Sequence, residues 1–216
     1  MSGGSIGVAW DIDGTLVDSE PLHERALRAV CARHGADLSD FDPDRFTGLH
    51  NKKVWAILAD RLAGRITRTA WLGEIEDYYE EHKDEIAPTP NAVSTIQALA
   101  KRGVLQACVS NASRRTVDTN LAALGIDTEI AFSLSLDDVI RGKPDPAPYH
   151  QACLGLGLAC SNVFAVEDSE TGIASARAAG LTVLGFNGTG GRVGLADHII
   201  DDLALVVDLI GRTRDA

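Results

Sequence analysis

Two aspartates stand two residues apart at the end of an apolar run near the start of the chain. The stretch "VAWDIDGTLVDSE", residues 8–20, closes that run on Asp11 and places Asp13 directly after the next residue. Two carboxylates this close repel each other unless a positive group lies between them. The pair is therefore either a polar turn or a site for a divalent cation and a reacting phosphate.

Other polar residues follow apolar runs in the same way. Ser110 and Asn111 follow "QACV", Glu167 and Asp168 close and follow "VFAV", and Lys143 lies in the loop "GKPDP". In an open α/β sheet, ligands bind at the carboxyl ends of the strands. If these runs are neighbouring strands, their polar residues meet at one edge of the sheet.

The chemistry that this set of residues supports is phosphoryl transfer. Asp11, Asp13 and Asp168 are hard oxygen ligands of the kind that Mg²⁺ prefers. A carboxylate kept ionised by Mg²⁺ can attack phosphorus and form an aspartyl-phosphate. Lys143 and the hydroxyl of Ser110 would stabilise the phosphoryl oxygens. Asp13 would protonate the leaving oxygen and later activate water.

The elements that must position these residues alternate between strand and helix. Runs apolar on both faces predict a parallel sheet that is covered on both sides. Helical patterns lie between them, one of them capped by Ser113 and ended by Gly125. The rhythm predicts a doubly wound, Rossmann-like α/β fold. The predicted strands start near residues 6, 104, 130, 163, 182 and 198.

One segment breaks this rhythm. Residues 19–87 hold no clear strand but show three helical patterns, the last ending in the charged run "EDYYEEHKDE". A charged run of this kind is typical of a solvated helix face. We expect a small all-helical cap domain at 19–87, inserted after the first strand of an α/β core formed by residues 1–18 and 88–216.

The motifs "DIDGT", "SN", "GKPDP" and "EDS-x-TG", in this order, resemble the four motifs of the haloacid dehalogenase superfamily. The resemblance covers nearly the whole chain and is to the phosphatase and phosphomutase branch, which has a helical cap after the first motif. The first motif continues as "DSE-x-x-H", similar to the β-phosphoglucomutase-like and sugar-phosphatase group.

The resemblance implies a role for each matching residue. Asp11 would be the nucleophile, Asp13 the general acid and base, and Lys143 the residue that stabilises the phosphoaspartate. Ser110 would bind the phosphoryl group, with Asn111 beside it.

The metal, Mg²⁺, would be held by Asp11, by the backbone carbonyl of Asp13, and by Glu167 and Asp168. Among residues of the insertion, His23, His50 and Asn51 are candidates for substrate binding.

The amino-acid composition limits the classes of molecule that the protein is expected to bind. The 216 residues carry a formal net charge of −11, which repels nucleic acid and anionic lipid. No apolar run approaches the length of a membrane helix, and the N-terminal residues lack the pattern of a signal peptide. The four cysteines form no CxxC pair, which is typical of free thiols in a reducing compartment. We therefore expect a cytoplasmic monomer that binds a small phosphorylated metabolite.

The leading hypothesis is a Mg²⁺-dependent phosphatase that acts on a sugar or polyol phosphate, and the alternative is a sugar phosphomutase. Where β-phosphoglucomutases carry an arginine after the cap glycine, this chain has Asn51 in "GLHN", which removes a bidentate phosphate clamp. Lys52 and Lys53 follow and could bind phosphate in place of the arginine, so the mutase stays open as an alternative. Dehalogenase-type relatives typically lack the second aspartate, which is present here as Asp13. A non-enzymatic regulatory module would not need the complete set of catalytic residues.

Overall fold

The computed structural model describes residues 5–46, 49, 51–188, 190 and 192–214. Within these residues, six strands form one parallel sheet in the order β5-β4-β1-β6-β7-β8. The strands of this sheet are β1 (Gly7–Trp10), β4 (Leu105–Val109), β5 (Phe132–Leu134), β6 (Val163–Glu167), β7 (Thr182–Phe186) and β8 (His198–Ile200).

The strand order is that of a doubly wound sheet. The chain runs outward from β1 through β4 to β5, then returns to the other side of β1 and continues through β6 and β7 to β8. The direction of winding therefore reverses between β1 and β6, and this is where open α/β sheets bind their ligands. The predicted fold class is confirmed.

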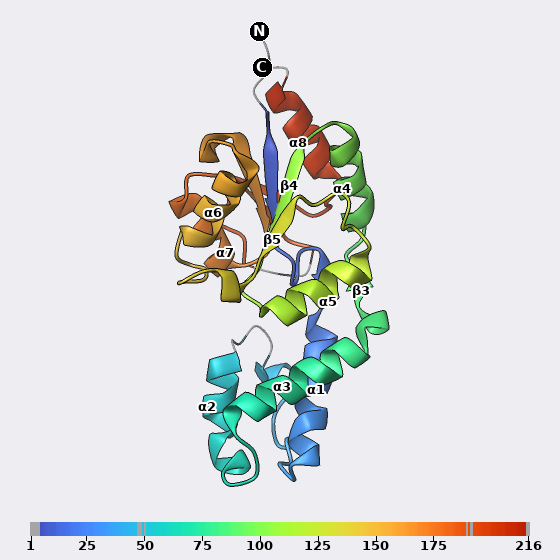
Figure 1. Cartoon of the computed structure of the whole chain (residues 1–216), viewed down its shortest axis with the longest axis vertical. Coiled ribbons are helices and arrows are strands. Elements are labelled where there is room, and N and C mark those ends of the chain that lie inside the picture. Colours follow the sequence, from blue (N-terminus) through green and yellow to red (C-terminus); the bar gives the residue numbers. More distant parts are fainter. Residues whose placement is uncertain (1–4, 47–48, 50, 189, 191, 215–216) are drawn as a thin grey trace. The chain divides into compact units, whose positions relative to one another are not determined.

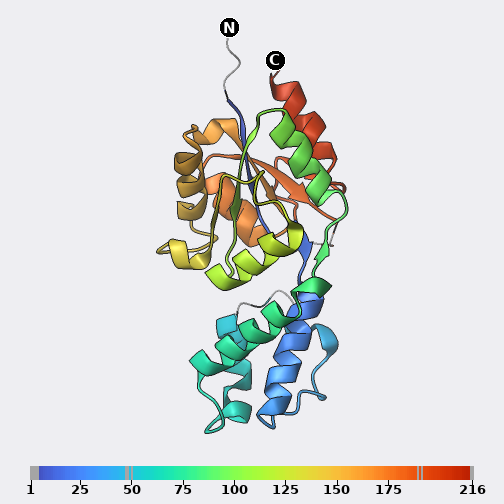
Figure 2. The same cartoon turned by 45° about the vertical axis from the view of Figure 1, so that its right-hand side comes forward.

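Helices cover both faces of this sheet. Figures 1 and 2 show α6 (Ala147–Leu156) and α7 (Glu170–Ala178) on one side, with α4 (Ala92–Lys101) and α8 (Leu205–Arg214) on the other. The helix α5 (Arg114–Leu124) follows β4; Ser113 caps its start by accepting the N–H of Thr116, and Gly125 ends it, as predicted. Short 3₁₀ turns lie at Leu136–Asp138 and Cys160–Asn162.

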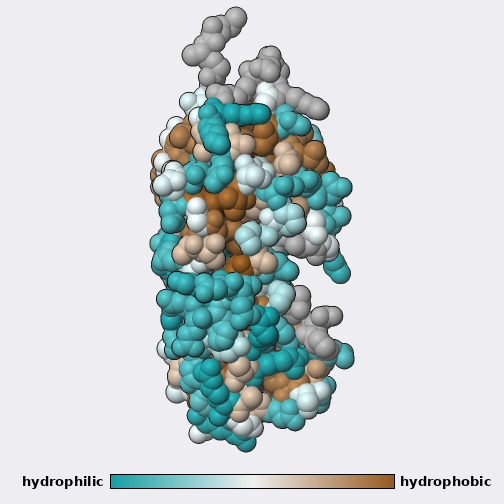
Figure 3. Space-filling model, turned by 90° about the vertical axis from the view of Figure 1, so that its right-hand side faces the viewer, coloured by the Kyte–Doolittle hydropathy of each residue, from teal (hydrophilic) through white to brown (hydrophobic). Residues whose placement is uncertain are grey.

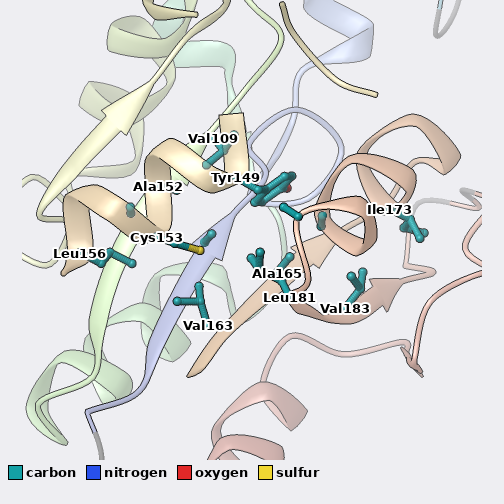
Figure 4. Close-up of a cluster of buried hydrophobic side chains, with 14 of the residues drawn as sticks. Val109, Tyr149, Ala152, Cys153, Leu156, Val163, Ala165, Ile173, Leu181 and Val183 are labelled. Carbon is teal, nitrogen blue, oxygen red and sulfur yellow. The ribbon is translucent and has the colours of Figure 1, made fainter. Parts of the chain in front are cut away.

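The core beneath α6 and α7 is built on small residues of the central strands. Ala9 lies in register with Ala107 on one side and with Ala165 on the other. These alanines belong to the buried cluster that contains Tyr149 of α6 and Ile173 of α7 (Figure 4). A row of small side chains lets helices with larger residues pack closely on the sheet.

Two elements differ from their predicted positions. The strand expected at residues 130–132 begins at Phe132, because its pairing with Ala107 of β4 sets the register. Thr89 followed by Pro90 is typical of a helix N-cap and a first-turn proline, so the sequence predicts a helix from residue 90. In the structure Asn91 adopts a left-handed conformation (φ 65°), and α4 begins at Ala92.

The chain divides into two compact units, residues 1–18 with 87–216, and residues 19–86. A two-stranded antiparallel ribbon of β2 (Val17–Asp18) and β3 (Ala87–Pro88) stands where the chain leaves and re-enters the first unit. Ala87 pairs with Asp18 in this ribbon, so it lies with the α/β unit.

The second unit is all helical in its described residues. It contains α1 (Glu20–Arg33), α2 (Asn51–Leu62) and α3 (Arg68–Glu81), with 3₁₀ turns at Pro43–Phe46 and Lys83–Glu85. Helix α3 buries Trp71, Ile75 and Tyr79, which are spaced four residues apart and therefore share one face. The charged run "EDYYEEHKDE", at the end of α3 and just after it, also contains exposed residues, as expected of a solvated face. The helical unit is mainly hydrophilic on the face shown in Figure 3.

The described helices include none that is both long and apolar enough to span a bilayer. The four cysteines are unpaired by disulfides in the structure, and Cys31, Cys108 and Cys153 are buried.

Candidate active site

Asp11 is the first residue after β1, and the sheet fixes its backbone. Its N–H donates to the carbonyl of Val166 on β6 (3.0 Å), which extends the strand pairing by one residue. The chain then turns: the N–H groups of Leu16 (2.8 Å) and Val17 (3.1 Å) both donate to the carbonyl of Ile12. This turn keeps Asp13 beside the end of the sheet.

The turn requires glycine at position 14. Gly14 has φ +85°, a left-handed conformation that other residues adopt only with strain. A Cβ atom at this position would also lie 2.2 Å from Oδ2 of Asp168. The glycine of "DIDGT" therefore lets the first loop approach the carboxylate that follows β6.

Lys143 joins the ends of three strands. Its Nζ donates to Oδ1 of Asp11 (2.6 Å), to Oε1 of Glu167 (2.6 Å) and to the carbonyl of Val109 (2.8 Å). Lys143 is buried, and burial alone lowers the pKa of an amine, but the charges of Asp11 and Glu167 outweigh burial and raise the pKa above its ordinary value. Lys143 is therefore a permanently charged, fully hydrogen-bonded cation.

Glu167 is held by a residue that the sequence did not single out. The hydroxyl of Tyr149, on α6, donates to Oε1 of Glu167 at 2.5 Å, and both side chains are fully buried. Burial raises the pKa of Tyr149 well above its ordinary value, and the negative charges of Glu167 and Asp11 raise it further. Tyr149 therefore remains a donor, and the same carboxylate oxygen accepts bonds from Tyr149 and Lys143.

Asn111 fixes the loop that carries Lys143. Its Nδ2 donates to the carbonyl of Lys143 (3.0 Å), and its Oδ1 accepts the N–H of Lys143 (2.8 Å). The amide of Asn111 is thus paired with backbone groups, the arrangement of a residue that holds a loop. The expectation that it contacts substrate stays a prediction.

Asp13 is held by donors from two other elements. Its Oδ2 accepts the hydroxyl of Ser110 (3.1 Å), and its Oδ1 accepts Nδ2 of Asn120 on α5 (3.0 Å). Ser110 Oγ in turn accepts the N–H of Ala112 at 2.9 Å. The sequence did not indicate Asn120, although a polar residue between Val117 and Leu124, on the buried face of a helix, is a signal that could have revealed it.

Three carboxylates gather beside Lys143. One oxygen from each of Asp11, Glu167 and Asp168 lies within 4.8 Å of the others. Asp11 Oδ2 is buried and accepts no hydrogen bond from the described residues. When ionised, the three carboxylates exceed the single ammonium by two negative charges, so the donor set fits a divalent cation bound by oxygen.

The electrostatics of the carboxylates agree with this fit. Burial raises the pKa of Asp11 well above its ordinary value, by more than Lys143 lowers it, and Glu167 and Asp168 add to the rise. Burial and the charge of Glu167 raise the pKa of Asp168 to about 7, against the lowering effect of Lys143. A raised pKa means that a carboxyl group binds a proton more readily, so a cation that prefers the ionised form would compete with that proton.

The structure brings together the seven candidates of the α/β unit: Asp11, Asp13, Ser110, Asn111, Lys143, Glu167 and Asp168. The other candidates belong to the helical unit. His23 stacks on Tyr79 with ring centroids 4.3 Å apart, and Asn51 is exposed as the first residue of α2. His50 lies outside the described residues. The roles of these residues remain predictions.

Asp11 follows β1, next to the place where the winding of the sheet reverses, and it is paired with the buried Lys143 beside an acidic cluster. This arrangement agrees with the family resemblance of the motifs. The sequence model of the haloacid dehalogenase-like hydrolase family matches residues 7–180. The chain belongs to this family.

Relatives of this chain indicate which kind of hydrolase it is. The chain is 30% identical over 200 residues, 91% of its length and 93% of the other's, to the validoxylamine A 7'-phosphate phosphatase of Streptomyces hygroscopicus subsp. limoneus. It is 30% identical to the hexitol phosphatase A of Escherichia coli (strain K12), over 84% of this chain and 82% of the relative. These relatives and the family confirm the predicted class, a hydrolase of phosphoric monoesters.

A solved structure shares the whole fold. The crystal structure of a predicted phosphoglycolate phosphatase from Haemophilus somnus 129pt superposes with a TM-score of 0.83 at 24% identity, covering 95% of this chain and 97% of the other. At this identity the likeness shows the fold alone.

Proposed function

We propose that this protein is a Mg²⁺-dependent phosphatase that hydrolyses a small sugar or polyol phosphate through an aspartyl-phosphate on Asp11. The observation that carries the proposal is the environment of Asp11. One of its oxygens is fixed by Lys143, and the other is buried beside two further carboxylates without a hydrogen bond from the described residues.

The metal would be held by Asp11 and Asp168, by the backbone carbonyl of Asp13, and by Glu167 directly or through water. Mg²⁺ suits this set because it prefers oxygen ligands and usually keeps several waters. When bound, it neutralises charge on the transferring phosphoryl group. Glu167 already accepts bonds from Lys143 and Tyr149, so Asp168 is the less encumbered ligand.

In the first half of the reaction, a carboxylate oxygen of Asp11 attacks phosphorus, and the bond from phosphorus to the leaving oxygen breaks. Asp13 gives its proton to that oxygen, so the product leaves as an alcohol. Lys143 holds Asp11 in place and offsets its charge, while the Ser110 hydroxyl and backbone N–H groups bind the phosphoryl oxygens.

In the second half, Asp13 is ionised and takes a proton from water. The oxygen of that water attacks phosphorus, the bond between phosphorus and Asp11 breaks, and inorganic phosphate is released. Asp11 and Asp13 return to their starting states, so the cycle needs no further reactant.

Residues 19–86 would act as a cap that selects the substrate, with His23, Asn51 and His50 as the first positions to test. Phosphatase relatives that act on validoxylamine 7'-phosphate and hexitol phosphates support a polyol-like substrate. The formal charge of −11 supports an enzyme that binds neither nucleic acid nor membranes. The four free cysteines support a location in the cytoplasm. We propose that the enzyme acts as a monomer.

The test is phosphate release from a panel of glycerol phosphate, phosphoglycolate, hexose 6-phosphates, hexitol phosphates and phosphogluconate, with Mg²⁺ or with EDTA. We expect metal-dependent release that Asp11→Asn abolishes. Conversion of β-glucose 1-phosphate to glucose 6-phosphate, followed in parallel without phosphate release, would instead identify a mutase. Release that survives Asp11→Asn would contradict the proposal.

A further inference from the structure

We infer that Asn120 is a positioning residue that holds Asp13 so that its Oδ2 alone gives and receives the proton of the reaction. The inference deepens the proposed function, because it rests on Asp13 as the general acid and base. Nothing in the motifs marks Asn120, and it is assigned by the geometry of α5 and the first loop.

The location of Asn120 is unfavourable for a polar side chain unless that side chain has a specific partner. Asn120 is 0% exposed and lies on the inner face of α5, three residues after Val117 and four before Leu124, both of which are also buried. Asparagine is a poor helix former, and burying an amide without hydrogen bonds costs stability. An apolar residue at this position would favour the fold more.

The partner that accounts for Asn120 is Asp13. Nδ2 of Asn120 donates to Oδ1 of Asp13 at 3.0 Å, from an element 107 residues further along the chain. The other oxygen, Oδ2, accepts the hydroxyl of Ser110 at 3.1 Å. The two oxygens of Asp13 are therefore held by two donors with different chemistry.

These donors behave differently once substrate arrives. The hydroxyl of Ser110 can rotate and is needed by the phosphoryl group, which frees Oδ2 of Asp13. Asn120 lies outside the sequence motifs, and its buried amide does not titrate, so it remains a donor whether Asp13 is charged or neutral. Oδ1 therefore stays occupied, and the proton resides on Oδ2.

The consequence is geometric control of proton transfer. The O–H bond on Asp13 Oδ2 breaks as the new O–H bond forms on the leaving oxygen, while the phosphorus–oxygen bond breaks. Without Asn120 the carboxyl group can turn and present either oxygen, and small misplacements of a catalytic group reduce rates strongly. The loss appears only where the leaving oxygen needs a proton.

The test compares two substrates in Asn120→Leu, which keeps the branched shape and the number of heavy atoms of the side chain and removes the donor. Glycerol phosphate has an alkoxide leaving group that needs protonation, whereas p-nitrophenyl phosphate has a stable phenolate that leaves without it. The ratio kcat/KM covers steps up to departure of the leaving group, so it isolates the action of Asp13 as an acid. We expect a loss of about 10- to 100-fold with glycerol phosphate and of less than about threefold with p-nitrophenyl phosphate.

Three further variants sharpen the result. Val117→Ala removes packing from the same helix without touching Asp13, and we expect it to leave the ratio between the two substrates unchanged. Asp13→Asn removes the acid itself and should give the largest loss of kcat/KM for glycerol phosphate relative to p-nitrophenyl phosphate. Adding Asn120→Leu to Asp13→Asn should then change the ratio no further, since the two residues act through one group. Asn120→Ala repeats the test should the leucine variant not fold.

Equal losses with both substrates, or no loss with either, would overturn the inference, as would a further change of the ratio in the Asp13→Asn background. Failure of the proposed function looks different. In that case the unaltered protein itself shows no phosphate release that depends on Asp11 from any compound of the panel.

Discussion

Lys143 is the residue on which the charge balance of the site depends. It bonds two buried carboxylates and a strand carbonyl at 2.6 to 2.8 Å. Removing one partner of a buried ion pair leaves uncompensated charge, which costs far more than the pair itself contributes.

We therefore predict that Lys143→Met abolishes phosphate release and lowers the free energy of unfolding by about 3 to 5 kcal/mol in EDTA. Mg²⁺ should restore part of this stability, because the cation supplies the missing positive charge. Urea unfolding with and without Mg²⁺ measures both effects. A variant as stable as the unaltered protein in EDTA would show that the carboxylates are not charged as argued.

The protonation of Asp168 makes the stability of the metal-free protein depend on pH. Its pKa is raised from an ordinary value of 3.8 to about 7, so the folded, metal-free protein keeps a proton that the unfolded chain has lost. Stability contributed by this group is therefore complete below the unfolded pKa and declines as the pH rises from there to about 7.

The expected outcome is that, in EDTA at about pH 8, the free energy of unfolding of Asp168→Asn exceeds that of the unaltered protein by up to about 4 kcal/mol, as measured by urea unfolding. The advantage should vanish at about pH 3, below the unfolded pKa, where both states hold the proton. Adding Mg²⁺ should stabilise the unaltered protein and not the variant. The opposite sign at high pH would mean that Asp168 is ionised at no cost without a cation.

At the scale of elements, the end of β6 and the start of α7 meet through a glycine. A Cβ on Gly172 would lie 1.9 Å from Oε2 of Glu167, so a side chain there must displace the carboxylate of Glu167 or move α7 away from it. The position of Glu167, and through it that of Lys143, depends on this close approach.

Gly172→Ala should destabilise the protein by about 1 to 3 kcal/mol through overpacking and reduce kcat about tenfold or more, although alanine favours helices. Gly73, in α3, is the matched control because a Cβ there meets nothing within 4 Å. Gly73→Ala should stabilise by about 0.5 to 1 kcal/mol. Calorimetry and kinetics on both variants decide the matter, and equal stability effects would contradict the structure of this junction.

The elements that carry the motifs were predictable, and the supporting residues were not. Apolar runs ending in polar residues indicated β1, β4 and β6 and the residues after them. Tyr149 looks like an ordinary buried aromatic in the sequence, and only the packing of α6 on the sheet reveals its bond to Glu167. Asn120 needs the position of α5 for the same reason. The pattern of residues along one segment does not show which residue of a distant segment it will contact.

At the scale of the whole molecule, the charge of −11 opposes the approach of a dianionic substrate. The site overcomes this repulsion locally, with Lys143 and the proposed cation, but association still takes place in the field of the whole surface.

We predict that kcat/KM for glycerol phosphate rises by about two- to fivefold between about 10 mM and about 200 mM KCl at saturating Mg²⁺, because salt screens the repulsion. The measurement is a series of initial rates at constant pH. A value of kcat/KM that falls with salt would show that attraction by the site dominates the encounter.

The central claim is that the phosphoryl group passes through Asp11, and it is tested most directly by trapping it there. The protein is mixed with Mg²⁺ and the best substrate of the panel, quenched in acid within the first turnover, digested at low pH and analysed by mass spectrometry. We predict one added phosphoryl group on the peptide that contains Asp11, and none in Asp11→Asn. A phosphoryl group on another residue, or none anywhere while phosphate is being released, would contradict the account.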